Sequence, residues 1–479
     1  MNRRTKIVAT LGPASDDEYT IEQLLKAGVN VFRLNFSHGS HADHAANIAR
    51  LRATARQLDI PVCLLQDLQG PKIRTGEIEG GAITLTAGQS FFLTTQPVRG
   101  NASAVSVDFP DLPKSVRPGG RILLDDGHLE LAVVSADEGQ IETKVIQGGV
   151  LKPHKGVNLP GVQLNVAALT EKDKMDLTFG LEQGVDAIAM SFVRTPGDIT
   201  RLRNAIARLA PEQKDTPIIA KLERPEALSN LEDIIKATEG VMVARGDLGV
   251  EMSPEAVPIA QKQIIAAANR HAKVVITATQ MLDSMINNPR HTRAEASDVA
   301  NAIFDGSDAV MLSGETAAGM YPVQAVEMMN AIICQAEAHI AEWGYCQSPT
   351  DSQARRDDTF FMTMAARELA HDRNVAAIAV FTKSGRSALL MSKARPDVPI
   401  LAFTPDSRTY HVMSLYWGVK PYLVSQVQTL EEMLQVVESA MVASTAIQPG
   451  QQVVVLCGFP VDAIRLTNMA ILHTVEEKF

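Results

Sequence analysis

Three charged residues near the middle of the chain have types and spacing that suit a magnesium site. Lys221 and Glu223 close one short apolar run, and Asp247 follows a second run after a gap of helix length. Side chains two residues apart in a strand lie on one face, so Lys221 and Glu223 are expected to project together. Mg²⁺ prefers carboxylate oxygens and leaves its other positions to water and substrate. The pattern predicts that Glu223 and Asp247 bind Mg²⁺ with the Lys221 ammonium beside it.

A purely structural role is the alternative for these three residues. Lys221 and Glu223 could form an ion pair at a strand end, with Asp247 as the cap of the next helix. Other polar residues also follow apolar runs, however: Arg33, Asn35, Ser37, Asp67, Gly246, Thr279 and Glu315. If these runs are parallel strands of one barrel, their carboxyl ends share one rim, where barrel active sites lie. The whole set therefore favours a site.

The elements that must position these residues form a repeating pattern. Eight short apolar segments alternate with helix-patterned spans, which predicts a (β/α)₈ TIM barrel with parallel strands buried on both faces. The strands are expected at 6–12, 29–36, 61–67, 185–193, 216–223, 240–247, 272–280 and 308–315. The helices are expected at 19–27, 41–58, 171–183, 198–209, 226–237, 256–270 and 292–304.

Two stretches depart from this pattern. Between residues 71 and 166, alternating runs are punctuated by Gly, Pro, Asn and Asp, which predicts a small inserted all-β domain, expected to be a β-barrel. It follows the third barrel strand and is expected to act as a lid, with hinges near Gly70–Pro71 and Asn165–Ala168. After a polar segment, strands and helices alternate again, which predicts an open α/β domain. The expected division is 1–70 and 167–345 (barrel), 71–166 (lid) and 346–479 (C-terminal α/β domain).

Composition restricts the functional class. The chain has 479 residues, of which 46% are hydrophobic and 21% charged, the balance of a globular protein. A net charge of −10 argues against a nucleic-acid surface. No apolar run reaches 18 residues, and the basic N-terminal stretch is interrupted at Gly12 and Pro13, so no membrane span or targeting segment is expected. Four cysteines without CxxC spacing fit reduced thiols, so a cytoplasmic location is expected.

Eight motifs of the chain resemble those of a known family. The stretch IIAKLERPEAL around Lys221 is similar to the signature of the pyruvate kinases, and seven further motifs occur in the same order: VFRLNFSHG, QDLQGPKIRTG, KGVNLPG, ARGDLGVE, ATQMLDSM, TRAEASDVANA and MLSGETAAG. The similarity is specific in the barrel and looser in the C-terminal domain.

The resemblance implies phosphoryl transfer from phosphoenolpyruvate to ADP, giving pyruvate and ATP as the last step of glycolysis. It implies catalytic roles for Lys221, Arg33 and Thr279, with Mg²⁺ held by Glu223 and Asp247 and replaceable by Mn²⁺. The substrate would contact Arg33, Lys221, Ala244, Arg245, Gly246, Asp247 and Thr279, its carboxylate lying at a helix N-terminus. The nucleotide would contact Arg33, Asn35, His38, Arg74 and Lys155, and would bring a second Mg²⁺.

Two details of the chemistry stay open at this stage. Thr279 or a water relay involving Glu315 and Ser313 could protonate the enolate. Many pyruvate kinases need K⁺, which by resemblance would be held by Asn35, Ser37 and Asp67, but the segment after Asp67 here contains Lys72 where those enzymes carry an acidic residue. A lysine ammonium could supply the same positive charge, so K⁺ is expected not to be required. Alternatively, Lys72 points to solvent and the three residues still bind K⁺.

The C-terminal domain carries a hydroxyl-rich turn at a helix start. Its residues are Thr382, Lys383, Ser384, Gly385, Arg386 and Ser387, a pattern explained either by helix capping or by an anion site. The resemblance implies a site for a phosphorylated allosteric effector in a homotetramer. The last loop, 458–468, departs from the Arg- and Gly-rich loop of members that respond to fructose 1,6-bisphosphate. A sugar monophosphate or a nucleotide monophosphate is therefore expected.

Two other functional classes, a lyase or aldolase and a non-catalytic regulator, fit these residues less well. A barrel with a magnesium carboxylate pair could be a lyase or aldolase acting on oxo acids, but a lyase needs neither the lid nor the nucleotide-side residues Arg74 and Lys155. A non-catalytic regulator would be expected to lack Lys221 or Asp247, and both are present.

Overall fold

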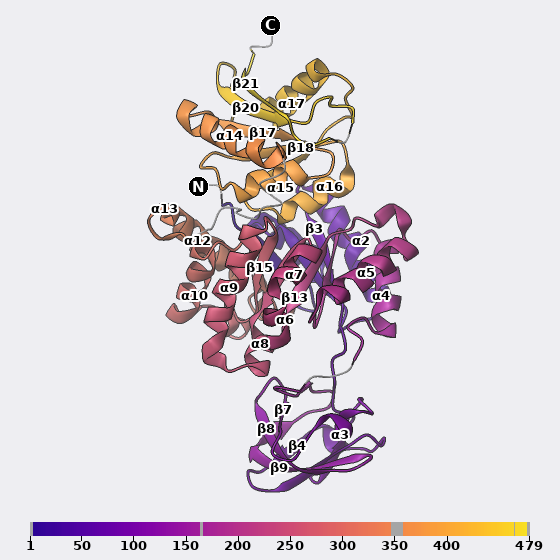
Figure 1. The fold of residues 1–479 in the computed structure, drawn as a ribbon. Helices are drawn as coiled ribbons and strands as arrows, with labels where there is room; N and C mark the ends of the chain where they lie inside the picture. The colour runs from indigo at the N-terminus through magenta and orange to yellow at the C-terminus, as the bar shows by residue number, and fades with distance from the viewer. Residues whose placement is uncertain (1–2, 163–165, 346–357, 464, 477–479) are drawn as a thin grey trace.

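The computed structural model describes residues 3–162, 166–345, 358–463 and 465–476. Figure 1 shows a central barrel, with the inserted β-domain at one end and the C-terminal α/β domain at the other. Asn165 of the second expected hinge and the expected boundary at residue 346 lie outside the described residues. Within the ranges described, no helix has the length and apolar character needed to cross a bilayer.

Eight parallel strands close the barrel in the order β1-β16-β15-β14-β13-β12-β3-β2. The TIM-barrel prediction is confirmed, because every expected strand segment contains one of these strands. Their bounds are Lys6–Thr10 (β1), Val31–Asn35 (β2), Cys63–Asp67 (β3), Ala187–Met190 (β12), Ile218–Leu222 (β13), Gly240–Ala244 (β14), Val274–Ala278 (β15) and Ala309–Leu312 (β16).

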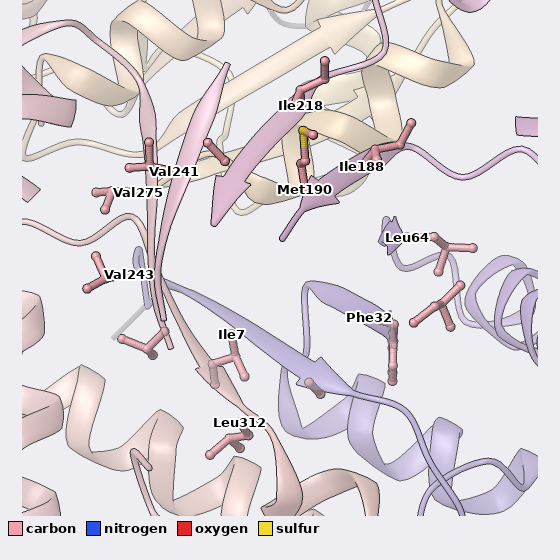
Figure 2. Packing of buried hydrophobic residues seen from close by; sticks show 14 of the residues in the cluster. Ile7, Phe32, Leu64, Ile188, Met190, Ile218, Val241, Val243, Val275 and Leu312 are labelled. Carbon is pink, nitrogen blue, oxygen red and sulfur yellow. The ribbon is translucent and has the colours of Figure 1, made fainter. Parts of the chain in front are cut away.

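Each barrel strand divides its side chains between two buried layers. Figure 2 shows residues of the outer layer, such as Ile7, Phe32 and Ile218, which pack in one hydrophobic cluster with the surrounding helices. Their neighbours in sequence, such as Val8 and Ile219, belong to a different cluster that fills the barrel and reaches the C-terminal domain. Because strand side chains alternate, the inward row of β13 runs from Ile219 to Lys221 and continues to Glu223 beyond the strand.

Helices surround this barrel. They are Glu18–Ala27 (α1), His41–Gln57 (α2), Glu171–Glu182 (α4), Pro196–Leu209 (α5), Pro225–Ser229 (α6), Leu231–Ala237 (α7), Arg245–Glu251 (α8), Val257–Arg270 (α9), Arg293–Phe304 (α10), Gly314–Ala317 (α11), Pro322–Ala338 (α12) and Ile340–Trp343 (α13). The single helix predicted at 226–237 is wrong. The Asn230 side chain donates to the carbonyls of Arg194 and Glu226, which interrupts the helix between α6 and α7.

The inserted β-domain lies between β3 and β12. A six-stranded sheet has the order β11-β7-β8-β9-β5-β6, and β10 pairs with β4. The bounds are Ile83–Leu85 (β4), Ser90–Thr94 (β5), Ala104–Ser106 (β6), Leu112–Ser115 (α3), Arg121–Leu124 (β7), Leu129–Ala136 (β8), Gln140–Gln147 (β9), Gly149–Leu151 (β10) and Val157–Asn158 (β11). The alternation in the sequence identified β4, β5, β8 and β9. The strands β6, β7, β10 and β11 were not identified from the sequence.

The C-terminal domain is a five-stranded sheet of order β19-β18-β17-β20-β21, in which β21 is antiparallel to β20. Its elements are Asp358–Arg373 (α14), Ala377–Phe381 (β17), Arg386–Lys393 (α15), Ile400–Thr404 (β18), Ser407–Val412 (α16), Val419–Leu423 (β19), Leu430–Ser444 (α17), Gln452–Cys457 (β20) and Met469–Thr474 (β21). The buried Lys393 of α15 pairs with Asp308, directly before β16. This ion pair joins the domain to the amino-terminal end of the barrel.

Candidate active site

Lys221 lies at the centre of a buried polar cluster at the carboxyl ends of the barrel strands. Its Nζ lies 2.8 Å from Glu223 Oε1 and 3.2 Å from Asp67 Oδ1, and it donates to Ser191 Oγ at 2.7 Å. An ammonium has three N–H donors, so these partners can take all of them. The expectation that Lys221 and Glu223 share a face is confirmed, and Asp67 joins them from β3.

The charges of this cluster are strongly coupled. Burial by itself would lower the pKa of Lys221, but Asp67 and Glu223 outweigh it and the pKa is raised. Burial raises the pKa of Glu223, with Lys221 acting against it and Asp247 adding to it. Burial opposes ionisation of Asp67 too, but Lys221 and Arg33 hold its pKa below the usual value. Lys221 therefore stays a cation at neutral pH.

Arg33 extends this cationic surface. Its Nε lies 2.6 Å from Asp67 Oδ2, and its guanidinium donates to the Thr10 hydroxyl at 3.2 Å. Val31 and Arg33 are two apart in β2 and both face the barrel interior. Thus two cations, Arg33 and Lys221, flank the buried Asp67 carboxylate at the rim.

Asp247 lies in the first turn of α8, which begins directly where β14 ends, rather than on the strand itself. Its Oδ1 is 3.6 Å from Lys72 Nζ. Both side chains are about three-quarters buried, which contradicts the alternative that Lys72 points to solvent. Lys72 therefore contributes positive charge at the edge of this site.

The start of α8 meets the end of β15 through Gly246 and Thr279. The Gly246 N–H donates to the Thr279 hydroxyl at 2.8 Å, and that hydroxyl donates to the Ala278 carbonyl at 2.6 Å. Thr279 has φ +67°, a conformation that β-branched residues rarely adopt and that concentrates at functional sites. The Arg245 side chain is turned to Asp298 and the Ala278 carbonyl, so only its backbone can serve a substrate here.

Glu315 and Ser313 follow β16 on the same rim. The Glu315 carboxylate accepts from the backbone N–H groups of Leu282 at 3.0 Å and Ser313 at 2.7 Å, and burial raises its pKa. The Ser313 hydroxyl is buried with no hydrogen-bond partner among the described residues. Glu315 thus holds the backbone of the β15 and β16 loops, and its carboxyl group keeps a proton more readily than usual.

The residues predicted to contact a nucleotide are divided between the barrel and the inserted β-domain. His38 lies beside β2, and burial together with Arg74, Lys72 and Arg33 lowers its pKa. Arg74 donates to the His154 carbonyl, and Lys155 Nζ pairs with Asp125 at 2.7 Å within the inserted domain. The Lys155 charge is therefore paired within the inserted domain itself.

Two of the three residues predicted to hold a monovalent cation have other side-chain partners. Asn35 Oδ1 accepts from the Ser37 backbone N–H at 3.1 Å, and both carboxylate oxygens of Asp67 face cations. Asn35 and Asp67 are register partners on β2 and β3, so their closeness follows from strand pairing.

Ser191 and Phe192 are site residues that the sequence reasoning missed. Ser191 accepts from Lys221, and the Phe192 N–H donates to Glu223 Oε2 at 2.8 Å. The signal was available, because Ala187 and Ala189 face the barrel interior and the same alternation places Ser191 inward. A lone serine after an apolar strand carries no chemical pattern of its own.

The carboxylates fit a magnesium ion. Asp247 adds unfavourable negative charge to the buried Glu223, which a divalent cation would offset. The described residues contain no group of three or more His, Cys, Asp or Glu placed to hold a metal. Two carboxylates are what Mg²⁺ requires from a protein when substrate oxygens complete its coordination.

The turn at the start of α15 lines a cavity of about 240 Å³ in the C-terminal domain. Gly385 has φ +76° and precedes the helix, and its N–H donates to the Thr382 hydroxyl at 3.1 Å. The opposite wall is formed by the last loop, including Val461 and Arg465, and Lys383 Nζ donates to the Asp462 carbonyl. The structure thus brings together, around one cavity, the turn at 382–387 and the loop at 458–468, the two segments from which an effector site was predicted.

The fold and this rim define a TIM-barrel enzyme with an inserted β-domain and a C-terminal α/β domain. Residues 2–326 match the family model described as pyruvate kinase, barrel domain, and residues 361–473 match pyruvate kinase, alpha/beta domain. The chain is 45% identical over its full length to pyruvate kinase of Geobacillus stearothermophilus, covering 81% of that protein. It is 47% identical, over 95% of its length, to pyruvate kinase 2 of a Synechocystis strain, covering 76% of it.

The chain belongs to the pyruvate kinase family. It is a phosphotransferase that moves the phosphoryl group of phosphoenolpyruvate to ADP, and the family uses Mg²⁺.

Proposed function

We propose that the cluster around Lys221 is the place where this phosphoryl transfer occurs. The observation that supports it most directly is that two carboxylates, those of Glu223 and Asp67, converge on the Lys221 ammonium. Phosphoryl transfer requires positioning and positive charge around the transferred group, and little covalent chemistry from the protein. Lys221 and Arg33 provide fixed cations, and the buried carboxylates prevent either from moving.

The remaining residues take roles that follow from their positions. The backbone at the start of α8, from Ala244 to Gly246, binds the substrate carboxylate together with Thr279, whose hydroxyl accepts from the Gly246 N–H in this structure. Glu223 and Asp247 would hold Mg²⁺, which would supply positive charge beside the phosphoryl oxygens. The proton for the enolate comes from Thr279 or from a water relay through Glu315 and Ser313. A cytoplasmic location and a homotetramer complete the proposal.

On the nucleotide side, Arg33, Asn35 and His38 line the barrel rim, and Arg74 and Lys155 arrive with the lid. Lid closure has to exchange the Lys155–Asp125 ion pair for a nucleotide phosphate. That ion pair is partly exposed, so breaking it costs little free energy.

The enzyme is expected to work without K⁺. Lys72 Nζ is 3.6 Å from Asp247, so the positive charge of Lys72 already lies beside this proposed magnesium ligand. The wild-type rate of pyruvate formation from phosphoenolpyruvate, ADP and Mg²⁺ should be nearly the same in tetramethylammonium and potassium buffers. The same assay tests the proposed function, which fails if no pyruvate forms. A wild-type rate that K⁺ raises a hundredfold would refute the role of Lys72.

The variant Lys72→Glu should create a requirement for K⁺, because it replaces the ammonium with a carboxylate that attracts a cation. Lys152→Glu, the same change at an exposed lid lysine, is the matched control and should stay independent of K⁺. Loss of rate in Lys72→Glu that K⁺ does not restore would contradict the exchange of one cation for another.

The cavity at the start of α15 is proposed to bind the phosphate of a sugar monophosphate or a nucleotide monophosphate. Ser384→Glu places a negative charge on its wall and should abolish activation, with the maximal rate at saturating substrate unchanged. Activation by AMP and by glucose 6-phosphate is measured as the shift of the half-saturating phosphoenolpyruvate concentration. Ser425→Glu, at an exposed serine that does not line this cavity, should keep full activation. Full activation of Ser384→Glu would place the effector elsewhere.

A further inference from the structure

A two-residue turn at the end of β12 contacts both Lys221 and Glu223. Ser191 is 2% exposed and reaches Lys221 through its side chain, whereas Phe192 reaches Glu223 through its backbone N–H. Lys221 lies in β13 and Glu223 directly follows that strand, yet both are held by adjacent residues of the loop that follows a different strand, β12.

The Ser191 hydroxyl has a defined orientation. It donates to the Leu68 carbonyl at 2.7 Å, so an oxygen lone pair is left to accept from Lys221 at 2.7 Å. The other two partners of Lys221 are the carboxylates of Asp67 and Glu223. A neutral acceptor on a third side keeps the ammonium from being drawn fully toward these charges. Without it, Lys221 would move toward the carboxylates and away from the phosphoryl group.

Phe192 adopts a backbone conformation that its residue type disfavours. Its φ is +55°, in the left-handed region where bulky residues are outliers. The ring and the preceding residue lie against Gly70, since a Cβ at Gly70 would come within 2.9 Å of Phe192 Cδ2 and 3.0 Å of Ser191 Cβ. This packing holds the conformation that aims the N–H at Glu223. Strained residues that the surroundings hold in place are typical of functional sites.

We propose that Ser191 and Phe192 form a positioning turn, in which Ser191 sets the Lys221 ammonium and Phe192 sets the Glu223 carboxylate. The proposal rests on the catalytic roles proposed above for Lys221 and Glu223. The alternative is that the turn only closes β12, in which case its two halves would affect stability without separable effects on catalysis and metal binding.

The Ser191 half is tested by steady-state kinetics at saturating Mg²⁺. Because misplacing a catalytic group by about 1 Å can cost on the order of a hundredfold in rate, Ser191→Ala should lower kcat at least roughly tenfold. The KM for phosphoenolpyruvate should change by less than about twofold. Ser191→Thr keeps the hydroxyl and should recover most of the rate. Wild-type kcat in folded Ser191→Ala, or an equal loss in Ser191→Thr, would overturn this half.

The Phe192 half is tested by direct binding of Mn²⁺, measured by electron paramagnetic resonance with no substrate present. Phe192→Ala removes the ring that holds the turn and keeps the cost of a positive φ, so Mn²⁺ affinity should fall about three- to tenfold. Phe192→Gly removes more of the side chain but adopts positive φ freely, and should bind Mn²⁺ more tightly than Phe192→Ala. Equal Mn²⁺ affinity of the two variants would overturn the proposal. Weaker binding by Phe192→Gly than by Phe192→Ala, the order expected from lost packing alone, would overturn it too.

Lys221→Met and Glu223→Gln, measured in parallel, distinguish a failure of the positioning turn from a failure of the proposed site. If Lys221→Met loses its rate and Ser191→Ala does not, the positioning turn is wrong and the proposed site stands. If Lys221→Met keeps its rate, the proposed site itself is wrong. Thermal unfolding of all variants checks that each is folded at the assay temperature.

Discussion

Lys221→Met is expected to lower kcat by roughly 10² to 10³ or more, with binding of phosphoenolpyruvate comparatively intact. Lys221 is a buried cation at the strand ends, and Asp67 and Glu223 raise its pKa against the opposing effect of burial. The ammonium is therefore fully charged and held in place before substrate arrives. Interactions of this kind act mainly on the transition state, so kcat should fall much more than KM rises.

The control for this variant must separate lost catalysis from lost stability. Removing one partner of a buried ion pair costs on the order of 3–5 kcal/mol, and Lys221 has two carboxylate partners. Lys393→Met removes another buried lysine, which pairs with Asp308 at the amino-terminal end of the barrel, opposite the carboxyl ends of the strands. It should lower the unfolding temperature comparably and leave kcat per folded enzyme near the wild-type value. Wild-type kcat in Lys221→Met would show that the assignment of Lys221 is wrong.

Removing either proposed magnesium ligand should raise the metal requirement steeply. Glu223→Gln and Asp247→Asn each delete one of two carboxylate charges, so the Mg²⁺ concentration at half-maximal rate should rise on the order of 10 to 100-fold or more. Mn²⁺ should partly restore the rate in both. The measurement is a Mg²⁺ titration of activity at saturating substrates, repeated with Mn²⁺.

The two variants should differ in stability while agreeing in metal dependence. Glu223 is buried and also accepts from the Phe192 N–H, whereas Asp247 is about one-quarter exposed. Asp186→Asn is the matched control, since this carboxylate is buried beside Arg52 at the opposite end of the barrel, before β12. Its Mg²⁺ titration should match the wild type. Unchanged titrations for both Glu223→Gln and Asp247→Asn would exclude the proposed pair.

Local pattern in the chain was enough to predict the barrel and the face on which its polar residues lie. Eight apolar runs alternating with helical spans define the strands, and a period of two places Lys221 and Glu223 on one side of β13. Asn35 and Asp67 could likewise be expected at one rim, because parallel strands end together. These inferences need only strand periodicity and barrel closure, which are properties of short segments and of one known architecture.

Tertiary structure alone decided which groups touch at that rim. Strand pairing and barrel closure bring Asp67 to Ser191 and Lys221, each more than 100 residues further along the chain, and no local pattern encodes such distances. The direction of Lys72 depends on how the chain leaves β3 at the lid hinge, so its approach to Asp247 could not be predicted. The break at Asn230 and the left-handed Phe192 likewise arise from contacts with distant residues, Arg194 and Gly70, which override local propensity.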